Sequence, residues 1–351
     1  MMQDIETLVA IILESRPKTQ RSEAVEWATY LQQLRGCHLL SAIGQDVDQA
    51  KWLKQRQVGI GGSEISAIMG ENHWNSPRQI WMSKIGALDD KPAQQSEAAR
   101  WGNVLETTVA EEWGIREKRQ WIHIPVILQH DEFPWLLANI DGFTLSDDRQ
   151  IITGILEIKT TSQFNADVWE NGPLPCHYID QANWYCGITG QPGFDLVCLV
   201  GGQKLYSYYI PFDEERFEEQ KAAAYTFWNE YVLKFVEPPT TATDKNLLKA
   251  EAEPDEDLPP VILDDEESER VADAYCQIRE KIGALEKVKD ALHAQLQVML
   301  GNSMLCLTKT RQLQLTKAGR RTCDFDLLEA KYPEAYNTAV TTKVFTQLRI
   351  K

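Results

Sequence analysis

Two largely apolar runs near the middle of the chain are separated by a short polar stretch. The first covers residues 138–143, the second covers residues 151–160, and a Ser/Asp-rich stretch at 146–150 lies between them. Apolar, β-branched runs on either side of such a cluster are typical of a β-hairpin. Successive side chains of a strand alternate between its faces, so Glu157 and Lys159 are expected on the same face.

Elsewhere, apolar residues recur every three or four positions, which predicts amphipathic helices. These helices are expected at 5–13, 22–34, 45–55, from 96 to about 113, 177–188 and 214–236. Two further apolar runs, at 121–129 and 194–200, are predicted to be strands. The second is followed by Gly201 and Gly202 and then by a return strand at 204–210, as in a hairpin.

The last third of the chain has a different pattern. Apolar residues step by threes and fours at Val271, Tyr275, Ile278, Ile282, Leu285, Leu292, Leu296 and Met299. This is a heptad-like stripe in which Lys289 is the one polar defect, and Gly301 is placed to end the helix. Strands are predicted at 305–316 and a short helix at 325–332. We interpret this tail as a packing or partner-binding element.

These patterns divide the chain into four parts. Residues 1–55 are predicted to be an N-terminal helical extension, and residues 56–236 form the core. Residues 237–263 have the acidic, proline-rich composition of a linker. Residues 264–351 carry the coiled-coil-like helix and a small β/α tail.

Charge and cysteine content narrow the possible classes of protein. The net charge of −16 argues against a general nucleic-acid binder, but residues 244–270 contain eleven acidic and three basic residues and so carry half of it. The seven cysteines include no CxxC pair, which favours reduced thiols and excludes the close ligand spacing of an iron–sulfur cluster. No apolar run of about 18 residues and no signal-peptide pattern occurs, so we expect no membrane span and a cytoplasmic location.

The central hairpin carries the clearest candidate chemistry. It can bring Asp141, Glu157 and Lys159 together at one edge of a sheet. Two carboxylates suit a hard cation such as Mg²⁺, which also binds substrate phosphate oxygens, and a neighbouring lysine can position water or offset developing charge. The alternative is a surface salt bridge of Lys159 with either Glu157 or Asp148.

A glycine-rich turn at residues 59–62 precedes Ser63, which is expected to be the N-cap of the next helix. Free backbone N–H groups at such a helix start suit a phosphate, and Arg56 could add a forked contact. The alternative is an ordinary capped helix after a glycine turn. A P-loop is excluded because the Gly-Lys-Ser/Thr signature is missing.

Three further residues are candidates with open alternatives. Trp74, in a loop before the Ser76-Pro77 helix start, could wedge between bases or belong to the core. Glu106, among apolar positions of a helix, could be a buried acid or a boundary residue. Gln181 could bind a phosphate or a water, or be a surface amide. His123 is interpreted as structural.

The motifs occur in a specific order along the chain. They are Arg56, the turn from Gly59 to Glu64, Ser76-Pro77…Trp81, Gly102…Glu106, Asn139…Asp141-Gly142, Glu157-Ile158-Lys159-Thr160 and Tyr178…Gln181. This order, over residues 56–236, resembles that of the YqaJ-type viral recombinases, the lambda-exonuclease branch of the PD-(D/E)xK nucleases. The resemblance implies a mixed α/β, restriction-endonuclease-like core with a central mixed sheet flanked by helices.

The resemblance also implies roles for the site residues. Asp141, Glu157 and the carbonyl of Ile158 would hold Mg²⁺, as two ions, with Mn²⁺ as a substitute. Lys159 would activate the attacking water, and Glu106 and Gln181 would complete the catalytic set.

By the same resemblance, three residues would hold a DNA 5′-phosphate: Arg56, Ser63 and Asn139. Asn139 departs from the small or hydroxyl residue expected at its position.

The implied function is a Mg²⁺-dependent exonuclease that digests linear double-stranded DNA from 5′ to 3′. It would leave 3′ overhangs for phage-type recombination by a single-strand annealing protein. The chain would form a homo-oligomeric ring, with a trimer favoured, in the cytoplasm of a bacterial host if it is phage-encoded. Two alternatives are an endonuclease or repair nuclease on the same core, and a non-catalytic recombination scaffold.

Overall fold

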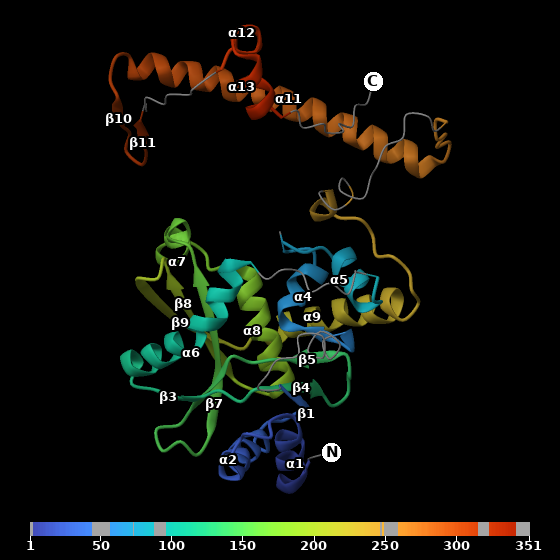
Figure 1. Ribbon diagram of the computed structural model, residues 1–351, viewed down its shortest axis with the longest axis vertical. Coiled ribbons are helices and arrows are strands. Elements are labelled where there is room, and N and C mark those ends of the chain that lie inside the picture. The colour runs from blue at the N-terminus through green and yellow to red at the C-terminus, as the bar shows by residue number, and fades with distance from the viewer. Residues whose placement is uncertain are drawn as a thin grey trace. The chain divides into compact units, whose positions relative to one another are not determined.

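The computed structural model describes residues 3–43, 57–72, 74–87, 96–245, 248, 259–314 and 323–341. The chain divides into two compact units, Met1–Leu248 and Lys249–Lys351, which we call unit 1 and unit 2 (Figure 1). The predicted helix at 45–55 and the candidate Arg56 lie outside the described residues.

The main sheet of unit 1 is mixed, and its strands lie in the order β3-β6-β7-β8-β9 (Figure 1). The strands are β3 (Gln120–Ile122), β6 (Gly142–Leu145), β7 (Ile152–Thr161), β8 (Gly193–Val200) and β9 (Lys204–Pro211). β7 and β8 are parallel, and the other neighbours are antiparallel. Both predicted hairpins, β6–β7 and β8–β9, are confirmed, but the first strand is shifted: β6 begins at Gly142, and Ala138 of the predicted run ends β5 (Leu136–Ala138) in another sheet.

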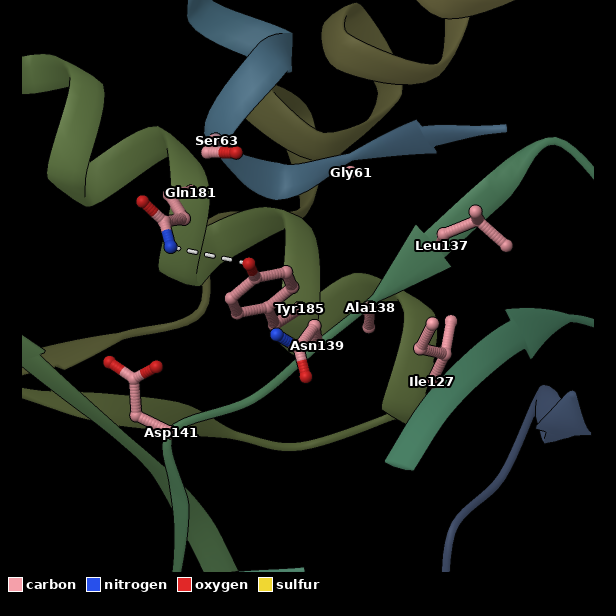
Figure 2. Close-up of a pocket in the computed structure, with 9 residues that line it drawn as sticks. All are labelled: Gly61, Ser63, Ile127, Leu137, Ala138, Asn139, Asp141, Gln181 and Tyr185. Atoms are coloured by element: carbon pink, nitrogen blue, oxygen red, sulfur yellow. Dashed lines mark hydrogen bonds between the residues drawn. The ribbon is translucent and has the colours of Figure 1, made fainter. Parts of the chain in front are cut away.

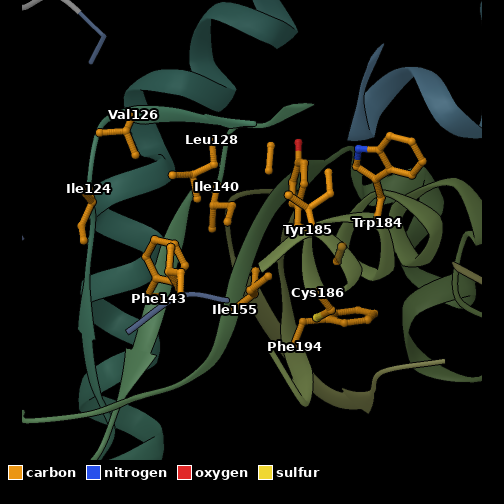
Figure 3. Packing of buried hydrophobic residues seen from close by; sticks show 14 of the residues in the cluster. Ile124, Val126, Leu128, Ile140, Phe143, Ile155, Trp184, Tyr185, Cys186 and Phe194 are labelled. Carbon is orange, nitrogen blue, oxygen red and sulfur yellow. The ribbon is translucent and has the colours of Figure 1, made fainter. Parts of the chain in front are cut away.

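Helices cover this sheet on both faces. On one face, Leu156 and Ile158 of β7 pack with Val109 and Trp113 of α6 (Glu97–Glu117). On the other face, the alternate residue Ile155 joins a cluster that includes residues of α8 (Cys176–Thr189), as Figure 3 shows. Burial on both faces explains why Ile155, Leu156 and Ile158, which alternate between the two faces of β7, are all apolar. The predicted mixed α/β fold, with a central mixed sheet flanked by helices, is confirmed.

The connection from β7 to β8 positions α8. It runs through η1 (Gln163–Asn165) and α7 (Ala166–Glu170) before α8 begins at Cys176. A parallel strand pair needs such a crossover, because a tight turn cannot return the chain in the same direction.

The N-terminal segment contains a strand that its helical pattern did not predict. After α1 (Ile5–Ser15) and α2 (Arg21–Leu31), β1 (Cys37–Ala42) pairs antiparallel with β4 (Val126–His130). β1 thereby joins a second sheet in the order β1-β4-β5-β2, in which β5 is Leu136–Ala138 and β2 is Ile60–Gly61. Buried residues of α1 and α2 belong to the same hydrophobic cluster as β4. This part of the predicted helical extension is thus part of unit 1 and not an appendage.

Two predicted element boundaries also change. The single strand expected at 121–129 is interrupted around Pro125, so β3 belongs to the main sheet and β4 to the second. Proline lacks the N–H that a continuous strand would use in its ladder, which explains the break. The helix expected at 214–236 begins as α9 (Glu214–Thr226) and continues as a π-helical segment, η2 (Phe227–Val232).

Three short elements surround the glycine turn. They are β2 (Ile60–Gly61), which pairs in parallel with β5 (Leu136–Ala138), and the helices α4 (Gly62–Ile68) and α5 (Pro77–Lys84).

The start of the predicted linker is held on unit 1. The hydroxyl of Ser76, the N-cap of α5, donates to the carboxylate of Asp244, which is fully buried at the end of η3 (Ala242–Asp244). Residues 241–244 were assigned to the linker at 237–263 from composition, and they pack against α5 because this buried contact holds them there.

Unit 2 agrees with its sequence pattern. Its long helix is α11 (Glu266–Leu300), with Gly301 as C-cap, followed by β10 (Leu305–Leu307) paired with β11 (Gln312–Gln314). Two short helices, α12 (Phe325–Lys331) and α13 (Pro333–Ala339), follow. Among the described residues, no helix combines the length and the apolar character needed to span a bilayer.

Candidate active site

Glu157 and Lys159 lie on the same face of β7, as predicted. Lys159 Nζ donates to Glu157 Oε1. The Glu157 side chain is fully buried and the Lys159 side chain is 17% exposed, so this is a buried pair and not the surface salt bridge of the alternative interpretation. Asp148 takes no part in it, since it lies in the exposed turn and accepts from Ser146.

Asp141 immediately precedes β6 and lies beside the same stretch of β7. Its Oδ2 accepts the backbone N–H of Ile158 at 2.9 Å. The two strands thereby bring the three predicted side chains, Asp141, Glu157 and Lys159, into one cluster. His123 Nδ1 lies 2.7 Å from the backbone oxygen of Asp141, a contact for which the sequence offered no signal.

Glu106 reaches this cluster from α6. That helix packs closely on the end of β7, where a Cβ added to Gly102 would lie 3.5 Å from Thr160 Oγ1. Burial and the charge of Asp141 raise the pKa of Glu106 to about 7, while Lys159 opposes the shift. Glu106 is of intermediate burial and interacts electrostatically with Asp141 and Lys159, so it lies between its two interpretations, a buried acid and a boundary residue.

The cluster holds more negative charge than one lysine can balance. Burial, with a contribution from Asp141, raises the pKa of Glu157 to about 8. Burial acts to lower the pKa of Lys159, but the Glu157 and Asp141 carboxylates outweigh it, and the pKa is raised. Glu157 Oε2 is buried without a hydrogen-bond partner. A buried carboxylate oxygen in that state is costly unless a cation or a proton satisfies it.

A small cavity of about 140 Å³ adjoins the cluster. Its lining comes from four separate segments, the glycine turn, β4, the end of β5 with the following loop, and α8, as Figure 2 shows. Its residues are Gly61, Ser63, Ile127, Leu137, Ala138, Asn139, Asp141, Gln181 and Tyr185. The predicted phosphate residues Ser63 and Asn139 thus share one cavity with the predicted catalytic residues Asp141 and Gln181.

Gln181 is directed to this cavity by its place on α8. Its Nε2 donates to the Tyr185 hydroxyl at 3.2 Å, one helical turn away. The alternative of a plain surface amide is therefore wrong. On the same helix, the Tyr178 ring lies 5.2 Å from Lys159 Nζ. The spacing of Tyr178, Gln181 and Tyr185 by three and four residues was the sequence signal for this shared helix face.

The glycine turn is built differently from the prediction. α4 begins at Gly62 with Gly61 as its N-cap, so the assignment of Ser63 as N-cap is wrong. The Gly61 N–H donates to the Glu64 carboxylate at 2.8 Å, which is the bond that the N3 side chain makes to the N-cap backbone in a capping box. A Cβ on Gly62 would lie 2.5 Å from the Tyr185 ring, so a glycine there allows α4 to approach α8. Ser63 still lines the cavity.

The Glu64 carboxylate is held in turn by Lys84, a residue that the sequence pattern did not single out. Lys84 Nζ donates to both Glu64 oxygens, at 2.8 and 2.9 Å, and its side chain is 1% exposed. A lysine in the last turn of α5 resembles any helix-terminal cation, so only the fold shows this pairing.

The predicted base wedge, Trp74, is not a core residue. Its side chain is 78% exposed, and its backbone N–H donates to Asn72 Oδ1 at 2.7 Å. It is not among the residues that line the cavity. Its exposure rules out the core interpretation, and the wedge role stays a prediction.

The cluster suits a hard cation better than a soft one. In the part of the chain that is described, no three His, Cys, Asp or Glu side chains group as a metal cage. The donors present are two carboxylates and the strand backbone, and one carboxylate oxygen, Glu157 Oε2, is buried and unsatisfied. Mg²⁺ is bound in this way, by one or two carboxylates with the remaining positions left to water and phosphate.

Comparison with known proteins finds a family model whose range includes the site residues. Residues 51–192 match the YqaJ-like viral recombinase domain, and they include Glu106, Asp141, Glu157, Lys159 and Gln181. The chain is 30% identical over 316 residues to the uncharacterized protein YqaJ of Bacillus subtilis (strain 168), which covers 88% of this chain and 96% of that protein.

Two solved structures are also similar. The alkaline exonuclease LHK-Exo from Laribacter hongkongensis has a TM-score of 0.43 and 16% identity, over 57% of this chain and 98% of that one. A phage related exonuclease from Haemophilus somnus 129PT has a TM-score of 0.35 and 14% identity, over 50% and 96%.

Proposed function

This chain belongs to the family of YqaJ-like viral recombinases, and we propose that its buried acidic cluster is the active site of a Mg²⁺-dependent exonuclease acting on linear double-stranded DNA. The observation that carries the proposal is the buried, unsatisfied Glu157 Oε2 in a cluster with Asp141 and Lys159. A cation there would relieve the desolvation cost of the carboxylate and would supply a Lewis acid for a phosphodiester.

The strand geometry supports a third metal ligand. The N–H and C=O of one strand residue lie on the same edge of the strand. Because the Ile158 N–H points to Asp141 Oδ2, the Ile158 carbonyl faces the same side. Asp141, Glu157 and this carbonyl are the proposed ligands, for two Mg²⁺ ions or for Mn²⁺ in their place.

The residues around the proposed ligands have different catalytic roles. Lys159, whose pKa is raised, stays an ammonium, so it acts as a donor and positive charge toward the attacking water and the scissile phosphate. Glu106, with a pKa of about 7, is the group best suited to accept a proton from that water. Gln181, held by Tyr185, is placed to orient the water or a phosphate oxygen.

The cavity supports a 5′-end preference. Its volume of about 140 Å³ is below the roughly 300–1,000 Å³ of pockets that take a drug-sized ligand, but it can take a phosphate. A terminal phosphate held by Ser63 and Asn139, with Arg56 as proposed from the sequence, would set the first phosphodiester beside Asp141. Digestion from 5′ to 3′ then follows, and it leaves 3′ overhangs.

The wider role proposed is phage-type recombination. The overhangs would pass to a single-strand annealing protein, and the enzyme would act as a homo-oligomeric ring, with a trimer favoured. These partners rest on the family alone.

End-labelled duplex DNA tests the proposal. We expect Mg²⁺-dependent digestion of linear DNA, faster with a 5′-phosphate than with a 5′-hydroxyl, and no cutting of closed circular DNA. Arg56→Ala should remove the preference for phosphate. Cutting of closed circles would indicate an endonuclease, and no digestion of any substrate would favour a recombination scaffold.

Lys159→Ala supplies the matching test of the site. We expect kcat to fall on the order of 10²–10³-fold, as for other preorganised donors, with the fold retained. Lys204→Ala, which removes an exposed lysine paired with Glu170, is the control and should digest normally. Normal digestion by Lys159→Ala would reject the assignment.

A further inference from the structure

An apolar stripe on α11 is left open to water. We call it the α11 seam. Its side chains are 39–73% exposed. They are Val271, Tyr275, Ile278, Ile282, Leu285, Leu292, Leu296 and Met299. A helix gains most of its stability in proteins by packing an apolar face, so an exposed stripe along so long a helix indicates a missing partner.

The spacing of the seam indicates what kind of partner it fits. Its positions alternate strictly by four and three residues from Val271 to Met299, with Lys289 in the one remaining position. That is a repeat of seven residues, and it gives a narrow seam on a helix that supercoils. A helix that packs on a globular surface has a wider stripe with a period of 3.6. The seam therefore fits another helix.

Length restricts the choice of helix. Residues 271–299 span about 42 Å at 1.5 Å per residue. The other helices described in unit 2, α12 and α13, have seven residues each, or about 10 Å, and cannot cover the seam. A second copy of α11 has both the matching length and the matching repeat.

Charges beside the seam complement each other in an antiparallel pair. With Ile282 at heptad position a, Arg279 and Glu286 both occupy e positions, and Lys281 occupies g. In an antiparallel coil the e residues of one helix face those of the other. When Ile282 lies opposite Leu285 of the second copy, Arg279 faces Glu286, and the twofold symmetry forms this ion pair twice.

The polar defect in the seam decides between the two directions. A parallel pair would also form an ion pair, Lys281 with Glu286, but it would place Lys289 opposite Lys289 in the core. In the antiparallel pair Lys289 lies opposite Ile278, and the two lysines are about 16 Å apart along the axis. That distance exceeds the Debye length of about 10 Å, so their repulsion is screened.

The flanking charges also define the register of the antiparallel pair. A shift by one heptad in one direction would place Arg279 opposite Arg279 and Lys281 opposite Lys281. A shift in the other direction would place Glu286 opposite Glu286. Like charges across an interface disfavour both alternatives.

We propose that α11 pairs in antiparallel orientation with α11 of a second copy of this chain, as a two-stranded coiled coil. Lys289 occupies a core position, where a single lysine sets register and strand number at a cost in stability. In a two-stranded coil its long side chain can reach water past the neighbouring positions. The pairing does not depend on the proposed nuclease activity. Because three helices of one trimeric ring cannot all form twofold pairs with each other, the pairing would join copies from two rings.

Charge reversal in the full-length chain tests both the pairing and its direction. Arg279→Glu alone and Glu286→Arg alone each place like charges across the coil, and each should raise the dissociation constant about tenfold in low salt. Two differently tagged variants, one of each kind, should associate with each other in preference to themselves. Sedimentation and two-tag capture from purified mixtures measure these effects.

Two matched charge reversals serve as controls. Lys281→Glu alters a residue that faces Val288 in the antiparallel pair, and it should leave the dissociation constant unchanged. Lys287→Glu lies outside the interface in either direction and should do the same. If Lys281→Glu weakens self-association and Arg279→Glu does not, the helices are parallel and the proposal is overturned.

A further variant should act in the opposite direction. Lys289→Ile removes the charged core position and should tighten self-association at least about tenfold. The proposal would be overturned if the Arg279→Glu and Glu286→Arg variants associate with each other no more than with themselves and Lys289→Ile has no effect on the dissociation constant. This holds even if the chain oligomerises through another surface. A monomeric wild type at micromolar concentration would also overturn it, and the seam would then belong to a different protein.

Discussion

Replacing Glu157 by glutamine separates two effects of the buried carboxylate: the folding free energy that its burial costs and its proposed role in binding Mg²⁺. Glutamine keeps an oxygen that can accept from Lys159 Nζ, as Glu157 Oε1 does. It cannot ionise, and it resembles the protonated form that the raised pKa of about 8 indicates for the metal-free protein. The variant should therefore fold at least as well as wild type without metal and lose its response to Mg²⁺.

The size of the first effect follows from the pKa of Glu157. Its folded value of about 8 exceeds the usual 4.5, so the folded protein holds a proton that the unfolded chain releases. The free energy of unfolding therefore falls by about 1.4 kcal/mol for each pH unit above the pKa of Glu157 in the unfolded chain, which is about 3 kcal/mol at pH 7. Wild type should lose stability relative to the variant as pH rises from 4.5 to 8, and the difference should level off above that range.

Metal should offset most of this difference in stability. At a Mg²⁺ concentration of 100 times the dissociation constant, binding stabilises the folded state by about 2.7 kcal/mol. For a unit of this size that corresponds to a rise in Tm of about 5–10 °C. Wild type should show this rise and Glu157→Gln should not.

Two measurements test these predictions. Urea unfolding with EDTA at pH 5 and pH 8 gives the stability without metal, and thermal unfolding with and without Mg²⁺ gives the response to metal. Asp195→Asn is a control, because Asp195 is a buried carboxylate bound by Arg119 and outside the cluster; its Mg²⁺ response should match wild type. If Glu157→Gln is clearly less stable than wild type at pH 8 in EDTA, the reasoning is refuted, since Glu157 would then be a stabilising ionised partner of Lys159.

Two further predictions concern the packing that holds the site. Gly62→Ala would place a Cβ 2.5 Å from the Tyr185 ring and should lower the free energy of unfolding of unit 1 by about 1–3 kcal/mol in urea. Gly283→Ala is the control, because its Cβ would meet no atom within 4 Å, and it should not destabilise the protein. Equal effects of the two substitutions would contradict the close approach of α4 to α8. Arg216→Met should cost about 3–5 kcal/mol because it removes the cation paired with Asp180, a buried aspartate of α8 that would keep only the neutral donor Gln220. Arg270→Met, at an exposed pair, should leave the urea midpoint unchanged.

Local patterns predicted the features that depend on near neighbours in the chain. Alternation along a strand placed Glu157 and Lys159 on one face, and their buried pairing confirms it. The heptad stripe predicted α11, and Gly301 predicted its end. These features follow from backbone geometry with a period of two or about 3.5 residues, so a short stretch of sequence is enough to define them.

Contacts between distant segments were decided only by the tertiary structure. The strand β1 became visible only through its pairing with β4. The burial of Glu157, the approach of Glu106 on α6, and the cavity built from the glycine turn, the β5–β6 loop and α8 have the same origin. Desolvation and charge interaction depend on which segments meet in space, and a pattern along the chain does not contain that information. The sequence alone therefore indicated which residues could do chemistry, while the fold determined that Asp141, Glu157 and Lys159 share one buried site.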